Sequence, residues 1–176
     1  MQWSKLKKKV ESLFCDSLKD RIKVYLTIYR KAHDEGSHFW IELDKETIFD
    51  ASELRWMVRY YKLSKEIREI TGDTDWTNPD QKEGYYKAYE YAEKILEKQG
   101  VFSDVYFYTA LEEYISKPID DILVSDNIVV QALGMIDRRL GKRRLAKINI
   151  KELNNDLVRF LFEIRCQAEE INYNEK

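Results

Sequence analysis

The two histidines of the chain, His33 and His38, lie close together in the sequence. Asp34 and Glu35 stand between them, so imidazole and carboxylate groups occur within one short segment. Such groups together can bind a transition metal or act as a general acid and base. A separation of five residues across Gly36 is not a standard spacing of metal ligands, and the sequence fixes no third strong ligand. We therefore predict a polar loop, and keep a metal site at His33, Asp34 and His38, or an active site in this segment, as the less favoured alternative.

The sequence contains none of the common catalytic motifs. There is no G-x-S-x-G, H-E-x-x-H, P-loop or G-x-G-x-x-G pattern. The two cysteines, Cys15 and Cys166, form no C-x-x-C pair that could hold zinc. A pair of carboxylates brought together by the fold, as in glycosidases, is left open as enzyme chemistry. We favour a protein that is not an enzyme, and we expect no cofactor.

The densest charge in the chain is a basic cluster of six cations within ten residues, with no acid among them. Its members are Arg138, Arg139, Lys142, Arg143, Arg144 and Lys147. Such a cluster can bind phosphate, an acidic partner or nucleic acid. Equally, the cations can stabilise a helix C-terminus, and charge runs are more often solvated or internally paired. The acids that could pair with them are Asp120, Asp121, Asp126 and Asp137.

Aromatic side chains form a second candidate surface. Tyr25, Tyr29 and Trp40 fall on one face of two predicted strands, opposite the apolar face. Several more occur near one predicted helix, namely Trp76, Tyr85, Tyr86, Tyr89 and Tyr91. Tyrosine is enriched at interfaces because it offers apolar area with a polar tip. The sheet face is predicted to be partly covered or partly a binding surface. For the tyrosine group we favour a role in the core, and keep an interface role for part of it as the alternative.

The first part of the chain mixes helix and strand. Residues 3–18 show an amphipathic helical pattern, with lysines opposite the apolar stripe. Residues 22–29, 39–43 and, more briefly, 47–49 have alternating patterns that indicate strands. Because the connections are too short for crossovers, the strands are predicted to be antiparallel. A helix over 51–71 follows, opened by Asp50 and Glu53 as a capping box and carrying two apolar stripes.

The rest of the chain has helical patterns. Residues 73–84 are polar, with Asn78-Pro79 as a turn signal. Helices are predicted from residue 85 to Gly100, from Ser103, at Pro118, and from Asn149 to the C-terminus. The run that begins at Asp126 is apolar on nearly all sides, which indicates a helix packed from several directions. We predict that this buried helix ends at Gly141 and holds the basic cluster at its far end.

The predicted fold class is α+β: an N-terminal helix and a three-stranded antiparallel β-meander, followed by a C-terminal α-helical bundle. We divide the chain into a helix–sheet–helix subdomain at 1–72, a polar connection at 73–84 and a bundle at 85–176, forming one compact unit. At 176 residues the chain is long enough for a substantial core.

Composition and charge indicate the compartment and the kinds of partner to expect. The net charge of −2 argues against a general nucleic-acid coat protein, so any cationic site has to be local. No apolar run approaches the ~20 residues needed to cross a membrane, and the lysines between Lys5 and Lys9 interrupt any signal peptide. Isolated cysteines favour a reducing compartment. We expect a cytoplasmic protein with no membrane partner.

Two segments resemble a known family. Trp3–Lys7 (W-S-K-L-K), followed by Tyr29–Asp34 and Trp40-Ile41, is similar to the start of a family of small uncharacterised bacterial cytoplasmic proteins. Ala132–Leu145 resembles that family's second signature, A-L-x-M-x-D-R-R-x-G-K-R-R-L. The resemblance implies a bacterial cytoplasmic protein and no established activity.

The sequence favours a non-enzymatic protein that binds another macromolecule, most simply another protein, in an interaction or regulatory role such as neutralising a toxin. The expected surface is the basic cluster, with the aromatic sheet face beside it as a further candidate. Nucleic-acid binding through the basic cluster is the second hypothesis, and an enzyme or metal site at His33–His38 is the third.

Overall fold

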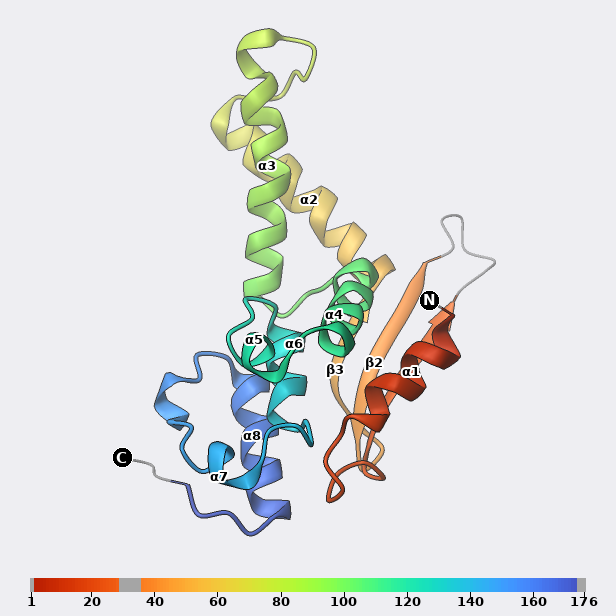
Figure 1. Cartoon of the computed structure of the whole chain (residues 1–176). Helices are drawn as coiled ribbons and strands as arrows, with labels where there is room; N and C mark the ends of the chain where they lie inside the picture. The colour runs from red at the N-terminus through yellow and green to blue at the C-terminus, as the bar shows by residue number, and fades with distance from the viewer. Residues whose placement is uncertain (1, 29–35, 174–176) are drawn as a thin grey trace. The chain divides into compact units, whose positions relative to one another are not determined.

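The computed structural model describes residues 2–28 and 36–173 of the chain. An N-terminal helix precedes a three-stranded antiparallel sheet and a series of helices (Figure 1). The predicted α+β class is therefore confirmed. The elements are α1 (Trp3–Ser12), β1 (Ile22–Ile28), β2 (Ser37–Leu43), β3 (Glu46–Ser52), α2 (Glu53–Thr71), α3 (Pro79–Lys98), α4 (Asp104–Ser116), α5 (Ile119–Leu123), α6 (Ile128–Met135), α7 (Lys142–Leu145), the 3-10 turn Ile150–Glu152 and α8 (Asp156–Ala168).

The three strands lie in the order β1-β2-β3, as the meander prediction requires. Asp44 and Lys45 alone join β2 to β3, and their φ angles of 51° and 74° are typical of the tight turn that suits a twisted hairpin. In β2, Phe39, Ile41 and Leu43 are buried and the side chains between them are half-buried. The alternation in the sequence therefore corresponds to a sheet with one face in the core and the other face partly open to solvent.

The chain divides into two compact units that interleave along the sequence. The first comprises Met1–Tyr25, Trp40–Phe49 and Phe107–Lys176, and the second comprises Leu26–Phe39 and Asp50–Tyr106.

In the second unit, α2 and α3 lie side by side as a helical hairpin (Figure 1). Trp56 and Tyr60 stack with their ring centroids 4.3 Å apart, and the Tyr60 ring lies 5.5 Å from that of Tyr89. The Arg68 guanidinium lies 4.5 Å from the ring centroid of Tyr85 and 4.8 Å from that of Tyr89. One of the two predicted stripes of α2 therefore faces α3 through aromatic and cation–π contacts.

The start of α2 differs from the prediction, because Asp50 and Glu53 do not form a capping box. Asp50 belongs to β3, and its carboxylate pairs with Arg55. The Glu53 carboxylate instead accepts a hydrogen bond of 3.2 Å from the backbone N–H of Asp104, at the start of α4.

The start of α3 lies earlier than the sequence pattern suggested. α3 begins at Pro79, inside the stretch predicted as a connection. The Asn78 side chain accepts the backbone N–H of Asp80 at 3.0 Å, and proline is tolerated at the first helical position because its missing N–H would have no partner there. The Asn78-Pro79 signal therefore marks a helix start.

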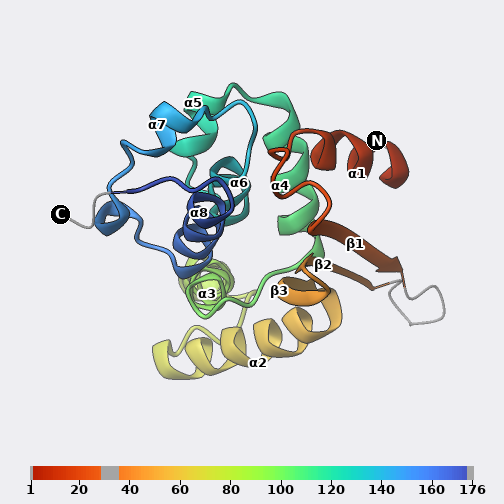
Figure 2. The same ribbon diagram turned by 90° about the horizontal axis from the view of Figure 1, so that it is seen from below.

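In the first unit, α6 packs against α8 and α5 (Figure 2). The apolar run after Asp126 is buried as predicted, but the prediction that its helix reaches Gly141 is wrong, since α6 ends at Met135. The backbone N–H of Arg138 donates to the carbonyl of Leu13 at 2.8 Å and so leaves the helical pattern. Gly141 has a φ of −65° and precedes the short helix α7, so it is not a C-terminal cap.

Two other helices are shorter than predicted. α1 ends at Ser12, because the segment after it pairs with residues 136–138: the N–H of Cys15 donates to the carbonyl of Ile136 at 2.8 Å. α8 begins only at Asp156, after Asn155 as its N-cap.

In the described part of the chain, no helix combines the length and the apolar character needed to cross a membrane.

Candidate functional site

The first half of the basic cluster is built around a buried carboxylate. Asp137 has no exposed surface, although it is charged. Two nitrogens of the Arg139 side chain donate hydrogen bonds to this carboxylate. Nε lies 3.1 Å from Oδ1 and 3.0 Å from Oδ2, and Nη2 lies 2.7 Å from Oδ2. The backbone N–H of Arg139 adds a hydrogen bond of 2.7 Å to Oδ1. This is a bidentate, charge-assisted pair, the strongest kind of side-chain hydrogen bonding.

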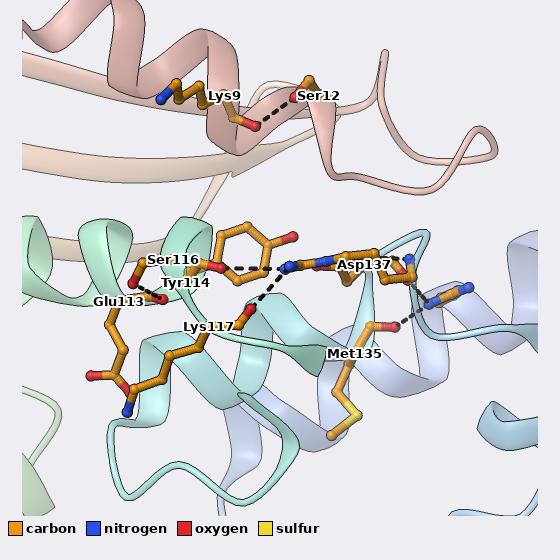
Figure 3. A network of polar contacts seen from close by, with 10 residues as sticks. Lys9, Ser12, Glu113, Tyr114, Ser116, Lys117, Met135 and Asp137 are labelled. Atoms are coloured by element: carbon orange, nitrogen blue, oxygen red, sulfur yellow. Dashed lines mark hydrogen bonds and ion pairs between the residues drawn. The ribbon is translucent and has the colours of Figure 1, made fainter. Parts of the chain in front are cut away.

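The same guanidinium closes the C-terminal end of α4. Arg139 Nη1 donates to the carbonyl of Lys117 at 3.0 Å, and Nη2 donates to the carbonyl of Tyr114 at 3.2 Å. Figure 3 shows both carbonyls directed toward the nitrogens beside Asp137. The last carbonyls of a helix have no partner within the helix, so Arg139 satisfies them. Its charge is therefore directed into the protein.

A second arginine holds the backbone around Asp137 in place. Arg165, on α8, is only 2% exposed. Its Nη1 donates to the carbonyls of Met135 (3.0 Å) and Asp137 (2.7 Å), and its Nη2 donates to that of Leu140 (2.6 Å). Because α8 is far away in sequence, Arg165 fixes the segment that follows α6 to another part of the fold.

The rest of the basic cluster is divided. Arg144 pairs with Asp120, and Lys142 Nζ lies 3.4 Å from the carbonyl oxygen of Glu169. Three exposed cations have no carboxylate of the described residues within ion-pair distance, and these are Arg138, Arg143 and Lys147. Of the six predicted residues, Arg139, Lys142 and Arg144 therefore interact with the protein's own carboxylates.

The aromatic face of the sheet is engaged in contacts of its own. The rings of Tyr25 and Trp40 stack with centroids 5.1 Å apart, and Lys7 Nζ lies 4.4 Å from the centroid of the Tyr25 ring. Trp40 Nε1 donates to Glu42 at 2.8 Å. The structure thus brings Tyr25 and Trp40 together, while Tyr29 lies outside the described residues.

The histidine segment is described only in part. His38 Nε2 lies 3.3 Å from Asp50 Oδ2, and the same carboxylate pairs with Arg55. His33 and Asp34 lie outside the described residues. Within residues 2–28 and 36–173, no three side chains of histidine, cysteine, aspartate or glutamate are grouped to hold a metal ion.

The cysteines are poor nucleophiles. Cys15 and Cys166 are both buried and free. Burial raises the pKa of the Cys15 thiol above its ordinary value, and raises the pKa of Cys166 to about 11. Since the thiolate is the reactive form, both side chains are uncharged near neutral pH and act as core residues.

A surface of which the sequence analysis named only a part lies on the α2–α3 hairpin. Of the aromatic group predicted there, Trp76, Tyr86 and Tyr91 are exposed, whereas Tyr85 and Tyr89 contact Arg68. Eight of the twelve large apolar side chains that are exposed in the described chain belong to this region: Leu54, Val58, Tyr61, Ile70, Trp76, Tyr86, Tyr91 and Ile95. The sequence contained the signal, because α2 has two apolar stripes and one partner helix covers only one of them. Val58 is 72% exposed and Tyr61 is 55% exposed.

Comparison with known proteins identifies a family. The model of the SF0329 protein family matches residues 2–166, which is nearly the whole chain. No curated protein and no solved structure matches the chain. The resemblance found in Trp3–Lys7 and Ala132–Leu145 is therefore confirmed. Within the second segment, Asp137 and Arg139 hold the fold together.

Proposed function

This chain belongs to the SF0329 protein family, and we propose that it is a non-enzymatic protein that binds another protein. The observation that carries the proposal is the exposed apolar stripe of α2, formed by Leu54, Val58 and Tyr61. Their spacing of four and three residues places them on one side of the helix. Contiguous exposed apolar side chains commonly mark interaction sites.

The stripe is presented on a supported element. On the opposite side of α2, Tyr60 stacks on Trp56, and its ring lies 5.5 Å from that of Tyr89 on α3. The contact of Arg68 with Tyr85 and Tyr89 also fastens α2 to α3. A surface that is held before binding loses less conformational entropy when the partner arrives. The exposed stripe suits an apolar groove or the apolar face of a partner helix.

The basic cluster supports the proposal less well. Arg139 is committed to Asp137 and to the end of α4, and Arg144 is paired with Asp120. What is left for a partner is Arg138, Arg143 and Lys147. We therefore propose the α2 stripe as the main contact and these three cations as a smaller one.

We also propose a cytoplasmic location. The buried free thiols of Cys15 and Cys166 support it, because a reducing compartment keeps such thiols unoxidised.

Affinity capture from the native host tests the protein-binding proposal. The variant Val58→Glu/Tyr61→Glu places two charges on the stripe, and we expect it to lose the protein that the wild type captures. The control Arg59→Gln/Lys62→Gln changes the net charge by the same amount on the exposed side of the same helix and leaves the stripe intact. We expect the control to retain the captured protein. Equal capture by both variants, or no specific capture by the wild type, would overturn the proposal.

A further inference from the structure

We propose that the end of the α2–α3 hairpin, residues 69–81, binds an arginine-rich segment of another protein. This hairpin tip comprises the last turn of α2, the connection between the two helices and the first turn of α3 (Figure 1). Ile70 lies about 18 Å along α2 from Val58, at a rise of about 1.5 Å per residue. The tip is therefore a different surface from the α2 stripe, and the proposal does not rest on that stripe.

The hairpin tip contains four acids and no lysine or arginine: Glu69, Asp73, Asp75 and Asp80. Glu69 lies 3.7 Å from Lys65 Nζ, whereas the three aspartates have no cation of the described residues within ion-pair distance. The cation on the α2 side of the tip, Arg68, is held against the rings of Tyr85 and Tyr89 on α3.

Lys82 is the first cation after the tip, and it is exposed. Even with Lys82 included, the unpaired carboxylates of this region outnumber its unpaired cations by three to one. The surface is therefore anionic, and a cationic partner complements it.

The tip also exposes two large apolar side chains among these acids. Ile70 is 85% exposed and Trp76 is 55% exposed. The face of an indole ring attracts a cation, and a guanidinium group can in addition stack flat on it. Carboxylates beside such a ring favour the same ligand through their charge. The combination selects arginine, flanked by apolar residues that cover Ile70.

The backbone that carries Trp76 is ordered by hydrogen bonds on both sides. Asp75 Oδ1 accepts the backbone N–H of Thr77 at 2.9 Å and its hydroxyl group at 2.6 Å. Gln81 Oε1 accepts the backbone N–H of Asp75 at 3.0 Å. The Asp73 carboxylate lies close against Gly84 of α3, in space that a larger side chain would occupy. An aromatic side chain presented on an ordered turn loses little conformational entropy on binding.

Two other ligands fit the tip less well. Tryptophan also suits the interface of a membrane, but the aspartates around Trp76 are repelled by the anionic lipids that attract most peripheral proteins. The acids of the tip also do not converge as metal ligands, since the described residues contain no group of three side chains suited to a metal ion. A basic protein segment uses both the charge and the apolar area.

Fluorescence anisotropy of a labelled peptide, LLRRLLRRLLRR, tests the inference. We expect the wild type to bind at about 50 mM salt, and to bind more weakly as salt screens the exposed charges. Trp76→Ser should lower the affinity at least tenfold, because a central aromatic side chain commonly dominates such a contact. Asp75→Asn/Asp80→Asn keeps the oxygen that accepts the N–H of Thr77 and removes two charges. We expect a loss of about fivefold, since exposed ion pairs contribute little each.

The matched control Glu90→Gln/Glu93→Gln removes two exposed acids of α3, about 15 Å or more beyond Asp80 along the helix. We expect its affinity to stay within about twofold of the wild type. Val58→Glu/Tyr61→Glu should also keep its affinity for the peptide, which separates the tip from the α2 stripe. Circular dichroism checks that each variant is folded.

Five results would each overturn the inference. These are absence of binding at about 50 mM salt, unchanged affinity in Trp76→Ser, an equal loss in either control, equal binding of the peptide with glutamine in place of arginine, and preferential binding of the protein to phosphatidylcholine vesicles.

Discussion

Asp137 is a charged residue without exposed surface, and Arg139 is the reason that it can be buried. Taking a carboxylate out of water costs several kcal/mol, which a well-formed ion pair with further hydrogen bonds can offset. Arg139 supplies the pair, and Arg165 binds the backbone on either side of the carboxylate. At the scale of the residue, Asp137 and Arg139 therefore have a structural role.

Replacing Asp137 by alanine should destabilise the protein strongly. The guanidinium of Arg139 would keep its position against α4 without its counter-ion, and breaking such a pair from one side typically costs about 3–5 kcal/mol. Urea denaturation measures the difference. Asp120→Ala breaks the exposed pair with Arg144 and serves as the comparison, and it should change stability little because exposed pairs contribute little. Similar urea midpoints for the two variants would contradict a structural role for the Asp137–Arg139 pair.

The helical hairpin of α2 and α3 and the contact between the starts of α2 and α4 are the features to consider at the scale of elements. Glu53 begins α2 and Asp104 begins α4, and the Glu53 carboxylate accepts the backbone N–H of Asp104. Burial first, and then the nearby Asp104 side chain, raise the pKa of Glu53 to about 7. The backbone hydrogen bond acts in the opposite direction and is outweighed.

The Glu53 carboxyl should make stability fall as pH rises. Its pKa in the folded protein, about 7, lies above the ordinary value of 4.5, so the folded state binds the proton more tightly than the unfolded state does. The stabilisation is complete below about pH 4.5 and is lost as pH rises to about 7. Thermal unfolding between pH 4.5 and 8 measures it. Glu53→Gln cannot titrate, and its Tm should decline less over this range than that of the wild type. Parallel curves for the two proteins would contradict the assignment.

Elements with a clean pattern could be predicted from the sequence, and their ends often could not. The alternation at residues 22–28 and 39–43 identified β1 and β2, because a period of two follows from the pleat itself. The end of α6 was predicted wrongly. It depends on hydrogen bonds made by Leu13, Asp137 and Arg165, which come from three separate parts of the chain. Local pattern contains no information on such distant hydrogen bonds.

For the candidate sites too, contacts between residues far apart in sequence could not be read from local patterns. Pairing of the basic cluster with Asp120 and Asp137 was one of the two interpretations left open, and the structure contains both pairs. The role of Arg165 could not be foreseen, because its acceptors are backbone carbonyls that any sequence would offer. The two apolar stripes of α2 were visible in sequence, but only the packing shows which stripe α3 covers.

The whole molecule presents surfaces of different chemistry on its two units. The second unit exposes the apolar stripe of α2, and the first unit exposes the cations Arg138, Arg143 and Lys147 of the basic cluster. Because the net charge of the chain is −2, its electrostatic attraction to a polyanion is limited to places where cations lie close together. On this account, the protein acts by bringing other macromolecules to these surfaces.

Photo-crosslinking in the native host tests the central claim, that the α2 stripe binds another protein. With p-benzoylphenylalanine in place of Val58, the account predicts a discrete covalent adduct with one partner protein. The same crosslinker in place of Lys151, an exposed position in the first unit, should give none. Absence of an adduct from position 58, or an adduct that forms only with the crosslinker in place of Arg143, would contradict the account.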